Sequence, residues 1–148
     1  MSGVLIRHTG LVVRNLDVSL AFYTDFFGFK LVNRQVESGP YIDSLVGIPQ
    51  VRLEWAKMTL PGGGMLELLQ YHSHPDLSVK PTPTPSNTHG CSQVALTVTN
   101  IDALYQKLVA GGYHTTSAPL HSPDGKVKVL YCQDPDNIIL EIVEELPL

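Results

Sequence analysis

The sequence predicts an α+β fold built from two tandem βαβββ modules, each with a curved mixed sheet. Three observations support this prediction: blocks of sequence that recur in the same order, an amphipathic helix pattern in each half, and a proline-rich stretch between the halves. With 148 residues, 43% of them hydrophobic, the chain can bury the core of one ordinary domain. We therefore expect a single domain over 1–148, with a first module at about 4–72, a linker at about 73–88 and a second module at about 89–146.

The repeat is visible in short blocks of sequence that appear in both halves. HTGLVVRNLD at residues 8–17 matches QVALTVTNID at residues 93–102, an offset of 85. PGGGMLELL, which starts at Pro61, matches PDNIILEIV, which starts at Pro135, an offset of 74. Recurring blocks in the same order indicate a duplicated structural unit, so both halves should share one layout.

The first module begins with a strand-like run at residues 8–13, rich in branched side chains. Asn15 can cap a following helix, Asp17 suits its positive end, and Gly28 can end it. The apolar positions of this helix fall on one face: Leu16, Leu20, Tyr23 and Phe27. Three strand-like runs follow, at about 29–37, 51–60 and 65–71.

The second module repeats this pattern. A strand is expected at residues 93–98, a helix cap at Asn100 and a helix stop at Gly111 and Gly112. The predicted buried stripe of the helix is Ile101, Leu104 and Leu108. Three further strands are expected at about 114–119, 126–132 and 137–144.

Two stretches lie outside this layout. The prolines between the modules favour an extended connector without helix or sheet, and we expect it from Pro75 to Ser86. A second irregular stretch, SGPYIDSLVGIPQ from Ser38, has no counterpart in the second module. Because long loops on duplicated scaffolds often contact substrate, we expect substrate contacts there, particularly from Tyr41 and Asp43.

Composition excludes several classes of partner. The net charge is −4 and no long run of one sign occurs, which argues against nucleic acid and anionic membranes as partners. The first residues lack a secretion signal, no run of 18 apolar residues occurs, and only Cys91 and Cys132 are present. We expect a cytoplasmic protein with two buried thiols. We also expect a homodimer, because apolar sheet edges would otherwise be exposed.

Four polar residues occupy equivalent positions in the two modules. His8 and Gln93 are related by the offset of 85, and Glu67 and Glu141 by the offset of 74. Side chains alternate along a strand, so each glutamate shares its face with large apolar neighbours. Taken singly, each residue is more often a hydrogen-bonded strand end or a solvated group. Their paired placement under two offsets favours one shared site.

The residue types of this set suit a divalent metal ion. A buried cluster of two carboxylates, an imidazole and an amide is costly unless a cation binds it. The other histidines have no equivalent partner or face the wrong way, and only a change of register would bring one of them, His89, into the site. We therefore predict His8, Glu67, Gln93 and Glu141 as the metal ligands.

The segments HTGLVVRNLDVSLAFYTDFFGFKLV, MLELLQ and DPDNIILEIVE resemble the vicinal oxygen chelate superfamily, which comprises glyoxalases, bleomycin resistance proteins and extradiol dioxygenases. The resemblance implies a glyoxalase-like fold and metal ligands at the first and last strand of each module. These positions are His8, Glu67, Gln93 and Glu141, and the ion would be zinc, nickel, cobalt, manganese or iron. Gln93 departs from the commonest form, in which this position is a histidine.

The resemblance implies a lyase or isomerase of the glyoxalase or epimerase type, which moves a proton next to a metal-chelated carbonyl of a small substrate or thioester. Glu141 is the candidate base and Glu67 the symmetry-related alternative. A dioxygenase fits less well, because Gln93 replaces a histidine and Glu67 adds a carboxylate. A fosfomycin transferase fits less well too, since no basic pocket for a phosphonate is apparent. The alternative of another class is a ligand-sequestering protein of the bleomycin-resistance type.

Overall fold

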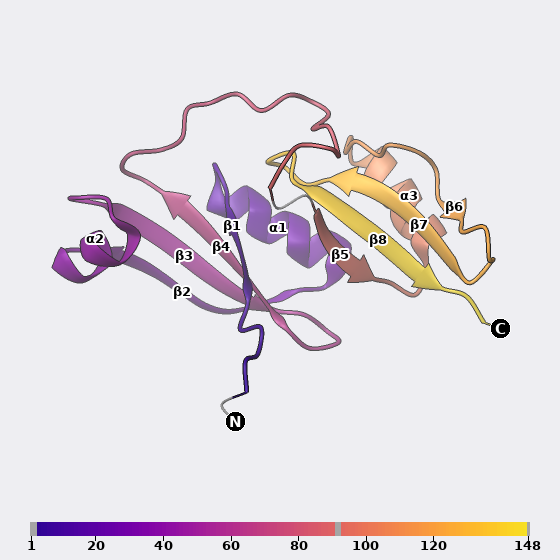
Figure 1. Cartoon of the computed structure of the whole chain (residues 1–148), viewed down its shortest axis with the longest axis horizontal. Coiled ribbons are helices and arrows are strands. Elements are labelled where there is room, and N and C mark those ends of the chain that lie inside the picture. The colour runs from indigo at the N-terminus through magenta and orange to yellow at the C-terminus, as the bar shows by residue number, and fades with distance from the viewer. Residues whose placement is uncertain (1–2, 91–92, 148) are drawn as a thin grey trace. The chain divides into compact units, whose positions relative to one another are not determined.

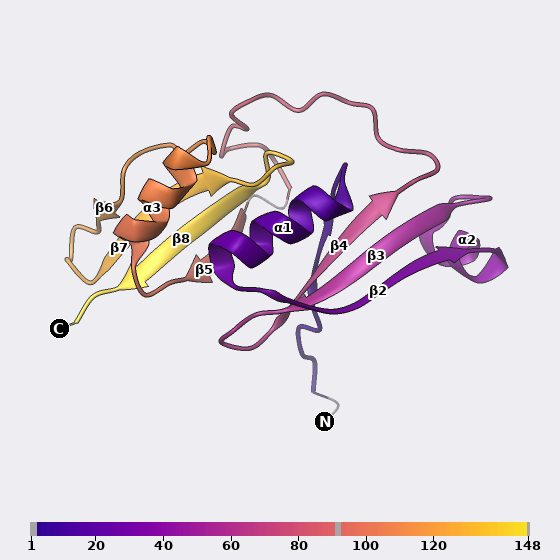
Figure 2. The ribbon, with the colours of Figure 1, turned by 180° about the vertical axis from the view of Figure 1, so that it is seen from behind.

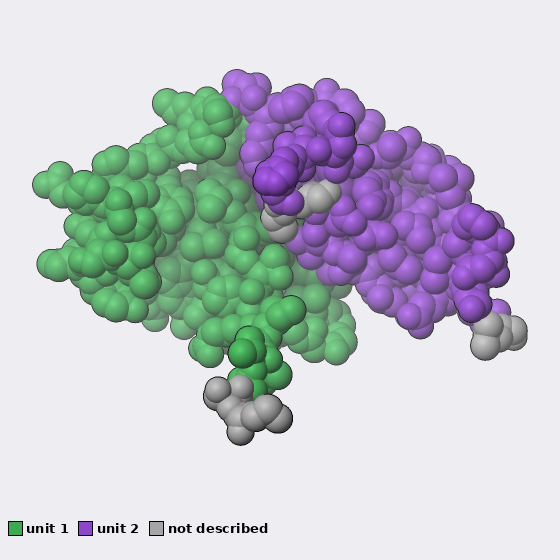
Figure 3. Space-filling model, viewed as in Figure 1, with its two compact units in different colours: residues 1–78 green, residues 79–148 purple. Residues whose placement is uncertain are grey.

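The computed structural model describes residues 3–90 and 93–147, so Cys91 lies outside the described residues. The chain divides into two compact units, Met1–Ser78 and Val79–Leu148, which are coloured separately in Figure 3. Each unit contains one four-stranded mixed sheet, which confirms the predicted α+β fold with a duplicated layout. That the two units make a single domain remains a prediction.

The described residues of the first unit form six elements (Figure 1): β1 (Thr9–Val12), α1 (Leu16–Phe27), β2 (Lys30–Ser38), α2 (Pro40–Val46), β3 (Arg52–Thr59) and β4 (Met65–Tyr71). The strand order of its sheet is β1-β4-β3-β2. β1 runs parallel to β4, whereas β4, β3 and β2 are antiparallel to their neighbours. The helix α1 packs against β4, on the face of the sheet that is turned toward the viewer in Figure 2.

In the second unit, the part of the chain that the structure describes forms five elements: β5 (Gln93–Thr97), α3 (Ile101–Ala110), β6 (Leu120–His121), β7 (Val127–Gln133) and β8 (Ile139–Glu145). Its strand order is β5-β8-β7-β6, with β5 parallel to β8 and the other pairs antiparallel. The helix α3 packs against β8. The second sheet therefore has the strand order and directions of the first.

Both long helices begin in the same way. The side chains of Asn15 and Asn100 each accept a hydrogen bond from the backbone N–H three residues later, at 3.1 and 3.0 Å, as predicted for helix caps. The first helical N–H groups are also satisfied from the last strand of each sheet. Gln70 Oε1 accepts from the Leu16 N–H at 2.7 Å, and Glu144 Oε2 accepts from the Ile101 N–H at 2.8 Å. The duplication thus extends to the contacts that fix each helix on its sheet.

The buried face of α1 differs in part from the predicted one. Leu16 and Tyr23 are buried as predicted, but Leu20 and Phe27 are only half-buried, and Phe22 and Ser19 are buried instead. Phe22 is buried within an aromatic cluster, with its ring centre 5.1 Å from that of Tyr23 and 5.7 Å from that of Phe27. The predicted stripe of α3, in contrast, is buried at Ile101, Leu104 and Leu108, as expected.

Alternation along the last strand of each sheet separates a helix-covered face from a second face. On β4, Leu66 and Leu68 are buried, and Gln70 on the same side contacts α1. Glu67 therefore points to the face opposite α1. On β8, Leu140 and Ile142 are buried and Glu144 contacts α3, so Glu141 likewise points away from its helix.

The prediction that residues 38–50 are irregular was wrong, because they contain α2. Pro40 occupies its first turn and Gly47 ends it in the left-handed conformation, with a φ of 71°. Ile42 anchors the helix in a small core with Val51 and Leu53. The carboxylate of Asp43 accepts hydrogen bonds from the backbone N–H groups of residues 50 and 51, at 2.8 and 2.9 Å. This gives Asp43, predicted to contact substrate, a role in holding the segment together.

The predicted strand at 114–119 was also wrong. A single bridge joins Thr115 to Cys132, and the regular pairing begins only with the two-residue strand β6 at Leu120–His121. Pro119 has no backbone N–H and restricts the residue before it, which prevents continuous pairing along this edge. The linker agrees with the prediction, since Pro75 to Ser86 contains neither helix nor strand.

No helix in the described part of the chain is both long enough and apolar enough to cross a membrane.

Candidate functional site

The first half-site lies on the face of the first sheet opposite α1. Glu67 of β4 pairs with Gly10 of β1. His8 precedes Gly10 by two residues and therefore lies on the same face of the sheet as Glu67. His8 Nε2 is 3.7 Å from Glu67 Oε1, and the two side chains are 26% and 14% exposed. The predicted pair of residues is therefore together and mostly shielded from water.

The separation of this pair suits a shared cation. At 3.7 Å the two atoms are too far apart for a hydrogen bond. Two ligands that each lie about 2.1 Å from one zinc ion would be separated by a distance of this order. Within the described residues, the buried Nδ1 of His8 has no hydrogen-bond partner. A half-buried imidazole and a carboxylate that do not satisfy each other fit the donor set of a divalent metal.

Lys57 belongs to the same half-site, although the sequence analysis did not single it out. It lies opposite Glu67 in the pairing of β3 with β4, and its Nζ is 3.8 Å from Glu67 Oε2. The ammonium also lies over the ring of Trp55, 4.7 Å from its centre. The hairpin turn between β3 and β4 sets this register, so pairing the two strands around the glycine-rich turn could have revealed Lys57.

The second half-site has the same plan with different side chains. Glu141 of β8 lies between Ala95 of β5 and Tyr131 of β7 in the register. Gln93 Nε2 donates hydrogen bonds to Glu141 Oε2 and to Tyr131 Oη, both at 3.0 Å. Tyr131, at the position equivalent to Lys57, is the second site residue that sequence reasoning missed.

The structure thus brings His8 beside Glu67 in one unit and Gln93 beside Glu141 in the other. Each half-site holds two of the four predicted ligands. No group of three His, Cys, Asp or Glu side chains able to hold a metal occurs among the described residues. That all four bind one ion remains a prediction.

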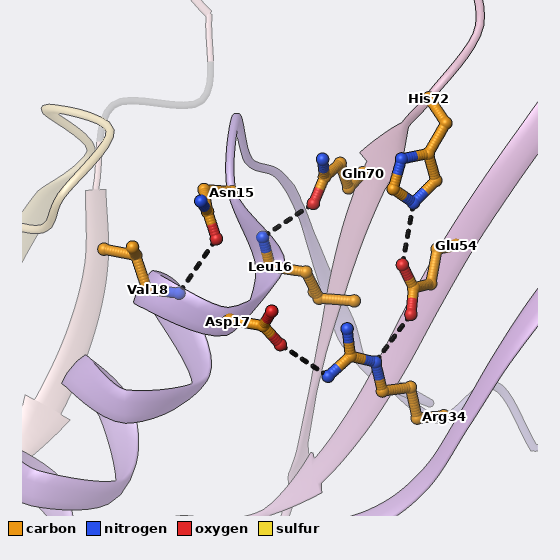
Figure 4. A network of polar contacts seen from close by, with 8 residues as sticks. All are labelled: Asn15, Leu16, Asp17, Val18, Arg34, Glu54, Gln70 and His72. Atoms are coloured by element: carbon orange, nitrogen blue, oxygen red, sulfur yellow. Dashed lines mark hydrogen bonds and ion pairs between the residues drawn. The ribbon is translucent and has the colours of Figure 1, made fainter.

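A polar network on the helix-bearing face of the first sheet accounts for one excluded histidine (Figure 4). His72 Nε2 is 2.7 Å from Glu54 Oε2, and Arg34 donates from Nε to Glu54 Oε1 at 2.6 Å and from a terminal nitrogen to Asp17 Oδ1 at 2.7 Å. These bonds, first from Arg34 and then from His72, lower the pKa of Glu54, and the bond to Glu54 raises the pKa of Arg34. His72 therefore faces away from Glu67, as the alternation of β4 predicted.

Cys132 is buried on β7, and its surroundings raise the pKa of its thiol to about 12, mainly by burial. This confirms the expectation of an ordinary buried thiol at that position.

The fold agrees with the comparison to known proteins. The family model of the Glyoxalase/Bleomycin resistance protein/Dioxygenase superfamily matches residues 5–142, and the chain belongs to this superfamily. Lactoylglutathione lyase from Schizosaccharomyces pombe is 31% identical in an alignment of 155 positions, which covers 98% of this chain and 49% of that protein. The chain therefore spans about half the length of this curated relative.

Solved structures show the same fold. A glyoxalase family protein from Bacillus cereus is 23% identical, with a TM-score of 0.86 over 99% of this chain and 98% of that one. A glyoxylase/bleomycin resistance protein/dioxygenase domain from Frankia sp. is 21% identical, with a TM-score of 0.71 over 98% and 100%. A mutant of the fosfomycin resistance protein FosX from Listeria monocytogenes, in complex with Mn(II) and 1S,2S-dihydroxypropylphosphonic acid, is 14% identical, with a TM-score of 0.63 over 96% of this chain and 89% of that one.

Proposed function

We propose that the chain is a metal-dependent lyase or isomerase of the glyoxalase type, which moves a proton on the carbon next to a carbonyl. The observation that supports it most is the equivalent placement of Glu67 and Glu141, each beside the polar residue at the first strand of its own sheet. The superfamily assignment and the similarity to a lactoylglutathione lyase along 98% of the chain support the same reaction class.

In this proposal His8, Glu67, Gln93 and Glu141 hold one divalent ion, which is zinc, nickel, cobalt, manganese or iron. The imidazole, the two carboxylates and the amide oxygen of Gln93 are ligand types that these ions accept. When bound, the ion would supply Lewis-acid polarisation of the substrate carbonyl. The FosX complex shows that a fold neighbour of this chain binds Mn(II).

The contacts of the two glutamates support Glu141 as the base. Glu67 has a cationic or potentially cationic group near each oxygen, with His8 facing Oε1 and Lys57 facing Oε2. Glu141 accepts a bond from Gln93 at Oε2 only, and its Oε1 has no hydrogen-bond partner in the described part of the chain. An oriented carboxylate with one oxygen still available can take a proton from a neighbouring carbon.

We further propose that the protein acts on a small-molecule substrate as a homodimer. The edge strand β2 exposes apolar side chains, with Leu31, Val32 and Val36 between 48% and 59% exposed. Exposed apolar edge strands invite pairing with another chain. Light scattering after size exclusion should give the mass of two chains, and a monomer would remove this part of the proposal.

Two measurements test the proposed function. Metal analysis of protein purified without chelators should find about one divalent ion per chain. Solvent deuterium should enter the carbon next to the carbonyl of methylglyoxal hemithioacetals or of 2-methyl-branched acyl thioesters, as followed by NMR. Protein without a metal and without exchange would instead support the ligand-sequestering class of this superfamily.

A further inference from the structure

We propose that Lys57 binds a carboxylate of the substrate and so makes the site selective for acidic substrates over neutral ones of the same shape. This inference rests on the proposed function, because it assigns the substrate class of the same site.

The ammonium of Lys57 is placed in the site without being satisfied there. Its side chain is 27% exposed, and its Nζ lies 3.8 Å from Glu67 Oε2, beyond hydrogen-bond distance. Among the residues that the structure describes, none accepts a hydrogen bond from it. An ammonium has three N–H donors, and no described residue occupies those of Lys57, which remain open to a ligand. An anionic ligand beside Glu67 could accept hydrogen bonds from them.

The neighbours of Lys57 keep it on the site face. Trp55, two residues earlier on β3, points to the same face and lies under the ammonium at 4.7 Å. Asn33 of β2 pairs with Lys57 across the strands and adds an amide to the same face. Asn33, Lys57 and Glu67 therefore lie side by side across β2, β3 and β4, and the two hydrogen-bond donors are on the side of Glu67 that faces away from β1.

The second half-site shows that this cation is not needed to support a glutamate on the last strand. Tyr131 stands at the position equivalent to Lys57, opposite Glu141, and it is a neutral phenol that contacts Gln93. The first sheet therefore carries a cation beside its glutamate, and the second sheet carries a neutral phenol at the equivalent position. A cation that the glutamate does not require is free to recognise a charged group of the substrate.

The test uses the single tryptophan of the chain, Trp55, as the reporter. Its fluorescence should change when a ligand reaches Lys57, so L-lactate and its neutral analogue L-lactamide are titrated into the metal-loaded protein. The wild type should bind lactate more tightly than lactamide. In Lys57→Met the affinity for lactate should fall about tenfold, with that for lactamide unchanged, and Lys57→Arg should restore most of the preference.

The comparison separates the contribution of Lys57 to the affinity from that of the metal ion, because any effect of the ion on the carboxylate is the same in the wild type and the variant. An unchanged lactate-to-lactamide ratio in Lys57→Met would overturn the inference. An equal loss of affinity for lactate and lactamide would also overturn it, because Lys57 would then only shape the site. A wild type that binds neither ligand would overturn it as well. Thermal melting checks the fold, and Lys57→Gln replaces the Met variant if that variant unfolds.

The outcome is distinguishable from failure of the proposed function, because the titration involves no turnover. A Lys57-dependent preference for lactate without proton exchange would leave the inference standing and the proposed reaction wrong. Proton exchange on neutral and acidic substrates alike, without a preference for lactate that depends on Lys57, would leave the proposed reaction standing and the inference about Lys57 wrong.

Discussion

Gln93 donates a hydrogen bond to Glu141 at 3.0 Å, whereas the equivalent pair of His8 and Glu67 is held 3.7 Å apart. The two halves of the duplicated fold thus differ in the contact that each glutamate makes with the polar residue beside it. In the first half the imidazole and the carboxylate do not satisfy each other, and in the second half the amide fixes one carboxylate oxygen. The first pair suits ion binding, and the second suits an oriented base.

Replacing Glu141 with Gln should abolish proton transfer and keep the ion. The amide retains a coordinating oxygen and the shape of the side chain but cannot accept the proton, so the exchange rate should fall by about 10² or more. Solvent deuterium exchange measured by NMR, together with metal analysis, checks both parts. Glu145→Gln, on the exposed end of the same strand, is the matched control and should behave like the wild type. Equal exchange in Glu141→Gln and wild type would show that Glu141 is not the base.

Replacing His8 with Ala should weaken metal binding. Loss of an imidazole from a four-ligand set should lower the affinity for zinc by about tenfold or more, because imidazole nitrogen is one of the preferred zinc ligands. Competition with a chromophoric chelator measures this affinity. His121→Ala, on the exposed strand β6, is the control and should retain zinc as the wild type does. Undiminished affinity in His8→Ala would remove His8 from the ligand set.

Removing the side-chain acceptor at the start of α3 should destabilise the fold. Glu144→Ala leaves the Ile101 N–H without its 2.8 Å partner, which should cost about 1 kcal/mol of unfolding free energy. Urea unfolding followed by circular dichroism measures the loss. Glu144→Gln keeps an acceptor, like Gln70 in the first unit, and should lose less. If Ala and Gln variants were equally stable, the bond would contribute nothing.

Much of the fold follows from local signals in the sequence. Asn15 and Asn100 cap helices as predicted, because a short polar side chain just before an apolar helix pattern can accept a hydrogen bond from a backbone N–H of the first turn. Alternation along β4 also predicted that His72 faces away from Glu67, as it does in the structure. Such features depend on residues close in the chain, and one sequence is enough to find them.

Other features depend on register and tertiary contact. Lys57 and Tyr131 join the half-sites only through the pairing of neighbouring strands, and no property of either residue alone indicates it. The seven-residue helix α2 was missed because it is too short to show periodicity, although Pro40 and Gly47 mark its ends. A sequence of one chain also does not show whether half-sites of different units share an ion.

The network around Glu54 predicts how stability depends on pH. Hydrogen bonds from Arg34 and His72 lower the pKa of Glu54 below its ordinary value of 4.5 in the folded protein. The folded state therefore gains stability from Glu54 above that value, and the gain is lost as the pH falls from about 4.5 through the lower pKa of the folded state.

Urea unfolding from about pH 6 down to about pH 3 should show this loss in the wild type and a shallower dependence in Glu54→Gln, because the amide does not titrate. Glu37→Gln is the matched control: Glu37 is a half-buried glutamate on the neighbouring strand β2, and this variant should keep the wild-type slope. A slope in Glu54→Gln as steep as that of the wild type would mean that the acid sensitivity arises from other carboxylates, and that the bonds in Figure 4 hold the segment after β4 without contributing to its pH response.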